Sequence, residues 1–415
     1  MECSPDALPD DLQSDLQGPV ADHIRIFISA GEASGDHYGA LILQALRERI
    51  LAAEFFGCAG SRLSAAGCQV VVDASAVTMV GLVEVIPGLP RAWRALQSLQ
   101  RAIVERRPQL AILIDFPDFN LRLAEQLKRQ GVPVLYFVAP QVWAWRKGRL
   151  KQIRRVVDRL LCLFPFEEKF FRDAGVNAEF VGHPLATRAR PLHRREEFLQ
   201  AAGAAANSTV IALVPGSRRK EVQLNLPAML DAARILAAER PCEFLLPAAP
   251  TLSSEWLRRQ LGSFAARVHI VKDSFHDAVA HSRAAIVASG TAATETAILG
   301  TPMVIVYRVT ELSWWLGRRL VDIPFFSMVN LVAGRQVVRE LIQDDYTGPA
   351  VAAELSKLLD DGEERSRVVA GLKEVTRSLS QSSDVAGRAA AGQGEFADPI
   401  QRAAAIAESM LLGKR

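Results

Sequence analysis

The chain has 415 residues, of which 49% are hydrophobic and 23% charged, and it carries a net charge of +3. This composition is that of an ordinary globular protein with room for about two or three domains, and it excludes a chain of low complexity. The charge is uneven, because residues 1–22 hold six acidic and no basic side chains, a charge of −6 that leaves +9 on the rest. A basic body fits anionic partners such as phosphorylated substrates, nucleic acid or an anionic membrane.

The five cysteines are scattered along the chain and include no C-x-x-C pair. This argues against a disulfide framework and a zinc site, and it favours a reducing compartment. The N-terminus lacks the basic and apolar regions of a signal peptide, and no run of about 18 apolar residues is present to span a membrane. The sequence therefore predicts a cytoplasmic protein and leaves peripheral membrane attachment open.

Residues 1–22 have the composition of a disordered tail, and a first series of alternating strands and helices follows them. The strands of this series are short β-branched runs, and the helices are amphipathic stretches. The predicted strands are 24–29, 54–56, 69–72, 110–114, 133–138, 158–163 and 179–181, and the predicted helices are 37–49, 89–106, 119–130 and 166–173.

A charged stretch, residues 186–207, is predicted to link this series to a second one. The second series has predicted strands at 209–214, 243–247, 268–271, 284–288 and 303–306, and predicted helices at 223–239, 251–260, 274–282 and 292–299. Two further helical segments, 350–380 and 397–412, enclose a Gly/Ala/Gln-rich stretch at 387–395.

Continuous apolar strands separated by helices indicate parallel sheets that are covered on both faces. Two such series predict an α/β protein with two Rossmann-like domains that face each other across a cleft. The expected domains are residues 23–185 and 208–380, and residues 381–415 are expected to form a flexible segment and a C-terminal helix.

Ligands of open α/β sheets bind at the carboxyl ends of the strands, and the first predicted strand ends in SAGEASGD, residues 29–36. Gly31 allows a tight turn there, and the helix start near Ser34 favours an anionic group by about 0.3–1 kcal/mol. Glycines that merely allow close packing of strand and helix are the alternative. We expect this loop to hold an acceptor.

Two strand ends of the second series predict a nucleotide site. In LVPGSR, the Gly216-Ser217 turn precedes Arg218, whose guanidinium can contact a pyrophosphate with several donors. In ASGTAATE, the small residues Ser289, Gly290 and Thr291 let backbone amides approach phosphate oxygens, and Glu295 can accept both hydroxyls of a ribose. The alternatives are an exposed arginine on a loop and an Ala-rich packing helix.

The motif DFPDFN, residues 115–120, places two carboxylates at the end of an apolar strand. Carboxylates there suit proton transfer, to which a positioned base contributes about 10²–10⁴-fold. The alternative is that Asp115 or Asp118 caps the following helix. No third acidic ligand is nearby in the sequence, so no metal is predicted.

The stretch VAPQVWAWRKGR, residues 138–149, combines two tryptophans with three basic residues. Arg146 and Lys147 beside these tryptophans predict a loop that lines the cleft and meets an anionic amphiphile. Core tryptophans beside a solvated basic helix are an equally good interpretation.

Together these stretches resemble lipid-A-disaccharide synthases, glycosyltransferases of the GT-B fold. The resemblance extends in order over residues 24–380 and includes MVGLVEV (79–85), FPFE (164–167), FVGHPL (180–185) and MVNLVAGRQVVRELIQDD (328–345). The chain departs from the family pattern in its acidic tail, in the stretch at 387–395 and in Phe116, where a small residue is usual.

The resemblance implies transfer of 2,3-diacylglucosamine from UDP to the 6-hydroxyl of 2,3-diacylglucosamine 1-phosphate (lipid X), with inversion and without a metal or other cofactor. For this reaction we expect Asp118 to be the base with Asp115 second, and Glu32 and Asn330 to orient the sugars. The leaving pyrophosphate would be stabilised by Arg218, the Gly216-Ser217 amides and the helix start at residues 289–292. His37 and His183 are weaker candidates.

The implied enzyme works at the inner face of the cytoplasmic membrane as a monomer or homodimer and does not bind nucleic acid. Acyl chains keep both substrates in the bilayer, since each buried CH₂ contributes about 0.8 kcal/mol. Arginines accompany the apolar residues of 79–99, which suits an anionic interface. The apolar contacts expected there are Val83, Val85, Ile86, Leu89, Trp93 and Leu96. A helix packed on the first sheet is the alternative for this stretch.

Three other functions compete with this one. An NAD-dependent oxidoreductase would need G-x-G-x-x-G after the first strand, and GEASGD is not that pattern. A nucleic-acid-binding protein is indicated only by the basic body and the Trp-Arg interleaving. A UDP-N-acetylglucosamine 2-epimerase would share the GT-B fold and a ribose-binding glutamate, so only the reaction product separates it from a glycosyltransferase.

Overall fold

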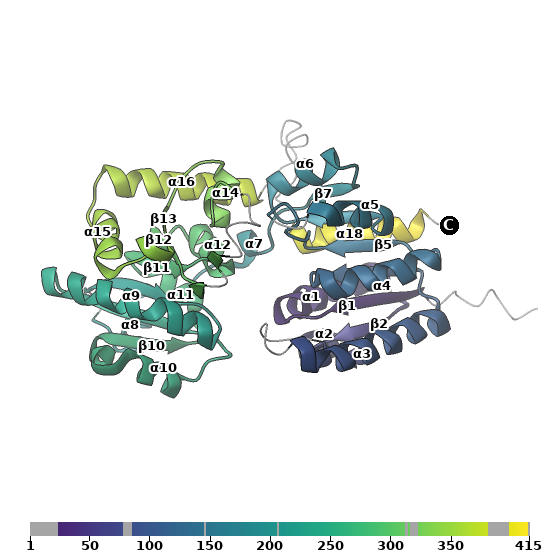
Figure 1. Ribbon diagram of the computed structural model, residues 1–415, viewed down its shortest axis with the longest axis horizontal. Helices are drawn as coiled ribbons and strands as arrows, with labels where there is room; N and C mark the ends of the chain where they lie inside the picture. The colour runs from purple at the N-terminus through teal and green to yellow at the C-terminus, as the bar shows by residue number, and fades with distance from the viewer. Residues whose placement is uncertain are drawn as a thin grey trace, which may run out of the picture. The chain divides into compact units, whose positions relative to one another are not determined.

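The computed structural model describes residues 24–77, 85–144, 147–205, 207–311, 314–315, 323–380 and 398–413 (Figure 1). For residues 85–89 and 265–266 it describes the backbone alone. Two sheets of strands with helices on their faces make up this part of the chain. The α/β class predicted from the sequence is therefore confirmed.

The first sheet has seven strands in the order β3-β2-β1-β4-β5-β6-β7. The pairings of β2 with β3, of β1 with β2 and β4, of β4 with β5, and of β6 with β7 are parallel. The strands are β1 Ile24–Ala30, β2 Ala53–Ala59, β3 Gln69–Asp73, β4 Leu110–Ile114, β5 Val134–Phe137, β6 Arg159–Cys162 and β7 Ala178–Phe180.

The second sheet has six strands in the order β10-β9-β8-β11-β12-β13, and all of its pairings are parallel. The strands are β8 Thr209–Val214, β9 Cys242–Ala248, β10 Val268–Lys272, β11 Ala284–Ala288, β12 Met303–Tyr307 and β13 Arg339–Ile342. The edge strand β13 was not predicted from the sequence, because its two charged residues, Arg339 and Glu340, interrupt the apolar run.

The α-helices lie mostly between consecutive strands, as parallel pairing requires. Those up to residue 202 are α1 Ala33–Arg49, α2 Ser61–Ala65, α3 Val85–Arg106, α4 Pro117–Arg129, α5 Leu150–Val156, α6 Pro165–Asp173, α7 Leu185–Arg188 and α8 Arg195–Ala202. The later ones are α9 Arg219–Glu239, α10 Ser254–Leu261, α11 Phe275–Ala280, α12 Thr291–Ile298, α14 Met328–Ala333, α15 Gly348–Leu359, α16 Glu363–Ser380 and α18 Pro399–Leu412. The helical segment expected at 350–380 is thus two helices, α15 and α16.

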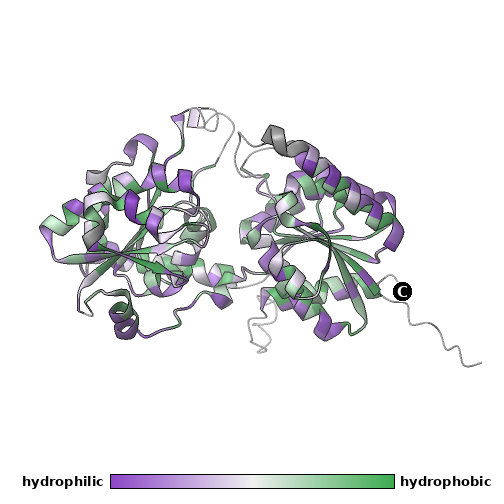
Figure 2. Ribbon diagram, turned by 90° about the horizontal axis from the view of Figure 1, so that it is seen from below, coloured by the Kyte–Doolittle hydropathy of each residue, from purple (hydrophilic) through white to green (hydrophobic). Residues whose placement is uncertain are grey.

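The apolar runs form strands because both faces of each sheet are covered. Every residue of β4 (LAILI) and of β11 (AAIVA) is buried, which is typical of a central parallel strand. Figure 2 shows the strands as predominantly hydrophobic and the outer faces of many helices as hydrophilic. The hydrophobic core therefore lies between each sheet and the helices that cover it.

By its internal contacts the described chain divides into two compact units. The first contains residues 24–137, 156–158 and 403–413, and the second contains residues 138–155 and 159–402. Within the first unit, the ion pair of Arg49 with Glu408 (3.1 Å) ties the end of α18 to α1. The domain boundaries predicted at 23–185 and 208–380 stay predictions.

Candidate active site

The carboxyl edge of the first sheet brings Glu32 close to Asp115. β1 and β4 pair with Ala30 opposite Ile114, so the residues that follow both strands leave the sheet as neighbours. Burial, and secondly the negative charge of Glu32, raise the pKa of Asp115 to about 6, against an opposing hydrogen bond from the Phe116 amide. A carboxylate with a pKa just below neutral pH suits a general base, because it is mostly ionised yet still accepts a proton well.

Asn120 fixes the loop that carries Asp115. Its buried side chain accepts a hydrogen bond from the Ser29 hydroxyl (2.7 Å) and donates to the carbonyl of Asp115 (2.8 Å). The hydroxyl of Tyr136 on β5 donates to the same carbonyl (2.6 Å), and the Asp115 amide donates to the carbonyl of Phe137 (3.0 Å). These bonds tie the ends of three neighbouring strands together and hold the carboxylate in place.

Asp118 lies in a different environment from Asp115. It is exposed in the first turn of α4, where a negative charge is favourable near the helix N-terminus. The N-cap of α4 is Phe116, which makes no side-chain cap, so neither aspartate caps the helix as the alternative interpretation required. Burial and a carboxylate neighbour thus distinguish Asp115 from Asp118, although the motif presents both equally.

The ring of Phe116 leaves no room for a side chain at residue 31. Phe116 has a left-handed backbone (φ 51°), and its ring lies against Gly31, where a Cβ would come within 2.4 Å of the ring. The ring also packs on Phe119, with ring centres 5.6 Å apart. The departure from the family pattern therefore fills the space above the first glycine of the loop.

Asp36, at the end of the same loop, has a structural role that the sequence analysis missed. Its buried carboxylate accepts hydrogen bonds from the amides of Gly60 (2.7 Å), Arg62 (3.0 Å) and Leu63 (3.2 Å), which begin α2. Ser34, by contrast, is exposed in the first turn of α1, which begins at Ala33 rather than at residue 37. The loop therefore fixes a helix start on one side and leaves Ser34 accessible.

In the second unit, the predicted nucleotide residues meet at one edge of the second sheet. β11 lies between β8 and β12, with Val214 opposite Val287, so the loops after β8 and β11 are neighbours. Gly216 has a φ of 120° and a Cβ there would come within 2.7 Å of Glu221, so this turn needs glycine.

The carboxylate of Glu221 occupies the amides that were predicted to bind pyrophosphate. It accepts hydrogen bonds from the amides of Ser217 (2.9 Å) and Arg218 (3.2 Å). An anion can reach these amides only by displacing that carboxylate. The Arg218 side chain is 69% exposed and 3.8 Å from Glu221, an ion pair that costs little to rearrange.

The start of α12 is an open helix N-terminus. Its N-cap, Gly290, has a φ of 154°, and a Cβ at this position would have no atom within 4 Å. Thr291, the first residue of the helix, is exposed. Ser289 is held in place because its hydroxyl donates to the carbonyl of Phe326 (3.1 Å). Backbone amides at such a start favour phosphate oxygens.

Glu295 lies in the second turn of α12. One of its carboxylate oxygens is 2.9 Å from Nε2 of His276, a residue at the start of α11. This partner cannot be recognised from local sequence patterns, because the two residues are 19 positions apart on different helices. His276 therefore orients the carboxylate that was predicted to hold the ribose.

Asn330 is not placed to touch a sugar. It is fully buried, and its amide donates to the carbonyl of Val338 (2.9 Å) and to Glu340 (2.8 Å). Its oxygen accepts hydrogen bonds from the amides of Val337 (2.7 Å) and Val338 (3.0 Å). All four hydrogen-bonding positions of this side chain are used, so in this structure Asn330 holds the turn before β13.

The stretch after β5 that carries the two tryptophans is partly buried in the hydrophobic core. Trp143 is buried, and its indole nitrogen donates to Glu167 (3.1 Å), a carboxylate whose pKa burial raises to about 8. Lys147 is exposed, whereas Trp145 and Arg146 lie outside the described residues. The core interpretation is therefore confirmed for Trp143.

The two weaker histidine candidates, His183 and His37, each contact another residue of the fold. His183 is buried, burial lowers its pKa to about 4, and its Nδ1 accepts a hydrogen bond from the Leu185 amide (3.2 Å). This neutral, bonded histidine fits a structural role. His37 in α1 has its ring 5.8 Å from that of Tyr38.

Of the predicted membrane contacts whose side chains the structure describes, one is exposed and one is buried. Trp93 on α3 is 56% exposed, but Leu96 is buried in the core, so Leu96 is not a surface contact. Val83 lies outside the described residues, and Val85, Ile86 and Leu89 belong to the backbone-only start of α3. No helix among the described residues is long and apolar enough to cross a membrane. The described histidine, cysteine and acidic side chains form no cluster of three that could hold a metal.

Comparison with known proteins agrees with the resemblance. The family model described as lipid-A-disaccharide synthetase matches residues 26–392. A lipid-A-disaccharide synthase from Solibacter usitatus is 48% identical over 366 residues, which cover 88% of this chain and 96% of the relative.

Solved structures share the fold at low sequence identity. The glycotransferase of kitacinnamycin has a TM-score of 0.61 at 15% identity and covers 93% of this chain and 99% of its own. The UDP-GlcNAc 2-epimerase from Neisseria meningitidis has a TM-score of 0.58 at 13% identity and covers 94% and 100%. These likenesses support the GT-B fold alone, whereas the sequence match is specific. The chain belongs to the lipid-A-disaccharide synthase family.

Proposed function

We propose that the chain joins UDP-2,3-diacylglucosamine to 2,3-diacylglucosamine 1-phosphate and releases UDP and the β-1,6-linked disaccharide 1-phosphate. The observation that carries this proposal is the family match over residues 26–392. The chain is thus a glycosyltransferase. The epimerase alternative is not favoured, because epimerases share only the fold with this chain, at 13% identity for the example above.

On the acceptor side, Asp115 is the base. It takes the proton of the acceptor 6-hydroxyl while that oxygen forms a bond to C1 of the donor sugar and the bond from C1 to UDP breaks. One such in-line displacement converts the α-linked donor into a β-linked product. The raised pKa of Asp115 and its fixed position support this role over Asp118, which reverses the order expected from the sequence.

On the nucleotide side, the negative charge that develops on the departing pyrophosphate needs fixed donors. The exposed Arg218 guanidinium and the open start of α12 at Gly290 and Thr291 provide them. Glu295, held by His276, accepts the ribose hydroxyls. An anion that binds the Ser217 and Arg218 amides would displace the Glu221 carboxylate from them. Anion binding would therefore be accompanied by a rearrangement of this turn.

The reaction is tested by its products. Purified protein mixed with UDP-2,3-diacylglucosamine and the monosaccharide 1-phosphate is expected to give one UDP for each disaccharide 1-phosphate, measured by mass spectrometry of the lipids and by chromatography of the nucleotides. Omitting the acceptor is the control and should leave the donor intact. An epimerised donor with no disaccharide would instead identify an epimerase.

Peripheral attachment to an anionic membrane through the start of α3 is part of the proposal. Val85→Ser with Leu89→Ser is expected to weaken binding to anionic liposomes and to lower activity on bilayer-embedded substrate, because each removes apolar area from the interface. Activity on detergent-dispersed substrate should fall much less, since the catalytic groups are untouched.

The matched control is Leu192→Ser, which removes a 72% exposed leucine of the second unit and should change neither assay. If the double variant lost activity equally in both assays and melted at a lower temperature, these residues would be core and membrane attachment through them would be wrong.

A further inference from the structure

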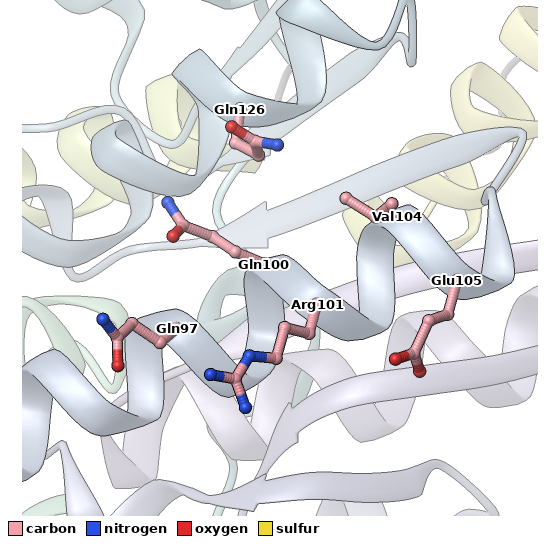
Figure 3. Close-up of a pocket in the computed structure, with 6 residues that line it drawn as sticks. All are labelled: Gln97, Gln100, Arg101, Val104, Glu105 and Gln126. Carbon is pink, nitrogen blue, oxygen red and sulfur yellow. The ribbon is translucent and has the colours of Figure 1, made fainter.

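A shallow groove of about 320 Å³ lies on the outer face of α3, against α4 (Figure 3). Its lining residues are Gln97, Gln100, Arg101, Val104 and Glu105 of α3 and Gln126 of α4. The groove lies within the first unit and is lined by none of the residues assigned to the reaction above.

The groove continues an amphipathic stripe of α3. Residues 93, 97, 100 and 104 follow helical spacing, so Trp93 and Val104 lie on one face about three turns apart. Trp93 is 56% and Val104 51% exposed, so apolar surface is accessible at two points of this helix face. The stripe therefore offers apolar contacts at both ends and amide side chains between them.

Basic side chains flank this stripe. Arg94 and Arg101 are exposed and seven residues apart, hence on one side of it, and Arg107 follows at the end of the helix. In the described ranges none of these three arginines forms an ion pair, and Glu105 is the one acidic residue that lines the groove. The face thus suits an acidic, apolar partner.

The chain itself contains a segment of that kind. Residues 1–22 carry six acidic and no basic side chains, and Leu8, Leu12 and Leu16 recur every four residues, with Asp10, Asp11 and Asp15 between them. This segment lies outside the family match, which begins at residue 26. Its pattern is the complement of an apolar stripe flanked by arginines.

The segment also leaves the fold beside α3. The Arg25 amide donates to the Gln109 side chain (2.7 Å), and the Gln109 amide donates to the Arg25 carbonyl (2.8 Å), three residues after α3 ends. The buried Nε of Arg25 has no hydrogen-bond partner in the described part of the chain. An extended segment of this length reaches about 70 Å, at 3.3 Å per residue, and α3 is only about 33 Å long.

We propose that residues 1–22 dock on this face of α3, with the leucines on the stripe from Trp93 to Val104 and the aspartates against Arg94 and Arg101. Tethering gives such a segment a local concentration in the millimolar range, so a weak contact is enough to populate the docked state. Docking would cover the basic face of α3 and compete with anionic lipid. That competition rests on the membrane attachment proposed above, whereas the docking itself does not.

Hydrogen exchange of the full chain without lipid tests the docking. Asp10→Asn with Asp11→Asn and Asp15→Asn should speed amide exchange in residues 93–107 by about threefold or more at low salt, because the docked segment limits local opening of the helix. Arg101→Glu should produce the same increase. About 1 M salt, where the screening length is about 3 Å, should abolish the difference from the unaltered chain.

The control is Arg258→Glu, the same charge change on an exposed arginine of α10 in the second unit, which should leave exchange in residues 93–107 unchanged. Equal exchange in the unaltered and triple-Asn chains at low salt would overturn the docking proposal. An effect that grows with protein concentration would also overturn it, since the contact would then be between chains.

Competition is measured separately with equimolar phosphatidylglycerol–phosphatidylcholine vesicles, to which the triple-Asn chain should bind about threefold to tenfold more tightly than the unaltered chain. Tighter binding without any change in hydrogen exchange would indicate long-range repulsion and contradict docking. A positive exchange result with no vesicle binding by either chain would leave docking in place and refute the membrane attachment, so the two failures are distinguishable.

Discussion

Asp115→Asn is expected to lower turnover by about 10²–10⁴-fold, the usual contribution of a positioned base, while UDP affinity stays nearly unchanged. The reason is that the proposed base acts on the acceptor hydroxyl alone, whereas the nucleotide contacts proposed above are made by other residues. Single-turnover kinetics and calorimetry with UDP measure the two quantities. The substitution keeps the volume of the side chain, so the bonds to the Asp115 backbone from Asn120 and Tyr136 are retained.

Asp118→Asn is the matched comparison, because it makes the same change three residues away on the exposed first turn of α4. We expect a much smaller loss from it. If Asp118→Asn lost about 10²-fold or more and Asp115→Asn retained near-normal turnover, the order predicted from the sequence would be right and the assignment of Asp115 wrong.

The pH profile provides an independent measure of the same assignment. A base works when deprotonated, so kcat/KM should fall as the pH drops through the pKa of Asp115, about 6. Glu32→Gln removes a negative charge that raises this pKa, so the acid limb should move to lower pH even if the maximal rate also changes. An acid limb that stayed in place would mean that Asp115 is not the group that titrates.

Arg218→Ala and Glu295→Ala are expected to weaken UDP binding by about 10-fold to 100-fold. Hydrogen bonds to charged groups contribute about 1.5–3 kcal/mol, and each 1.4 kcal/mol corresponds to a factor of ten in Kd. The lower end applies to Arg218, which is 69% exposed and well screened, and the upper end to Glu295, which is mostly buried beside His276. Calorimetry with UDP alone measures both without the lipid substrates.

Arg219→Ala is the control for Arg218. The guanidinium of Arg219 lies over the Trp256 ring at 5.5 Å, so this neighbouring arginine is engaged elsewhere and its loss should leave UDP affinity unchanged. Unchanged affinity in both Arg218→Ala and Glu295→Ala would instead show that the nucleotide does not bind at the edge of the second sheet.

Much of the fold follows from local sequence patterns. Buried strands such as LAILI and AAIVA can be recognised because a central parallel strand is apolar along its whole length. The edge strand β13 was missed for the opposite reason, since its charged residues interrupt the run. The predicted start of the first helix was also wrong. The apolar periodicity predicts a helix from residue 37, whereas α1 begins at Ala33, inside the glycine loop.

The sequence by itself determined the class of fold, the order of the strand-end motifs and the family, because these depend on patterns within short stretches. Only the tertiary structure distinguished the environment of Asp115 from that of Asp118, bound the Asn330 amide within the turn before β13 and paired Glu295 with His276. The physical reason is the same in each case. A pKa, a satisfied amide and an oriented carboxylate depend on neighbours that are close in space, and 83 residues separate Asp115 from the Glu32 that raises its pKa.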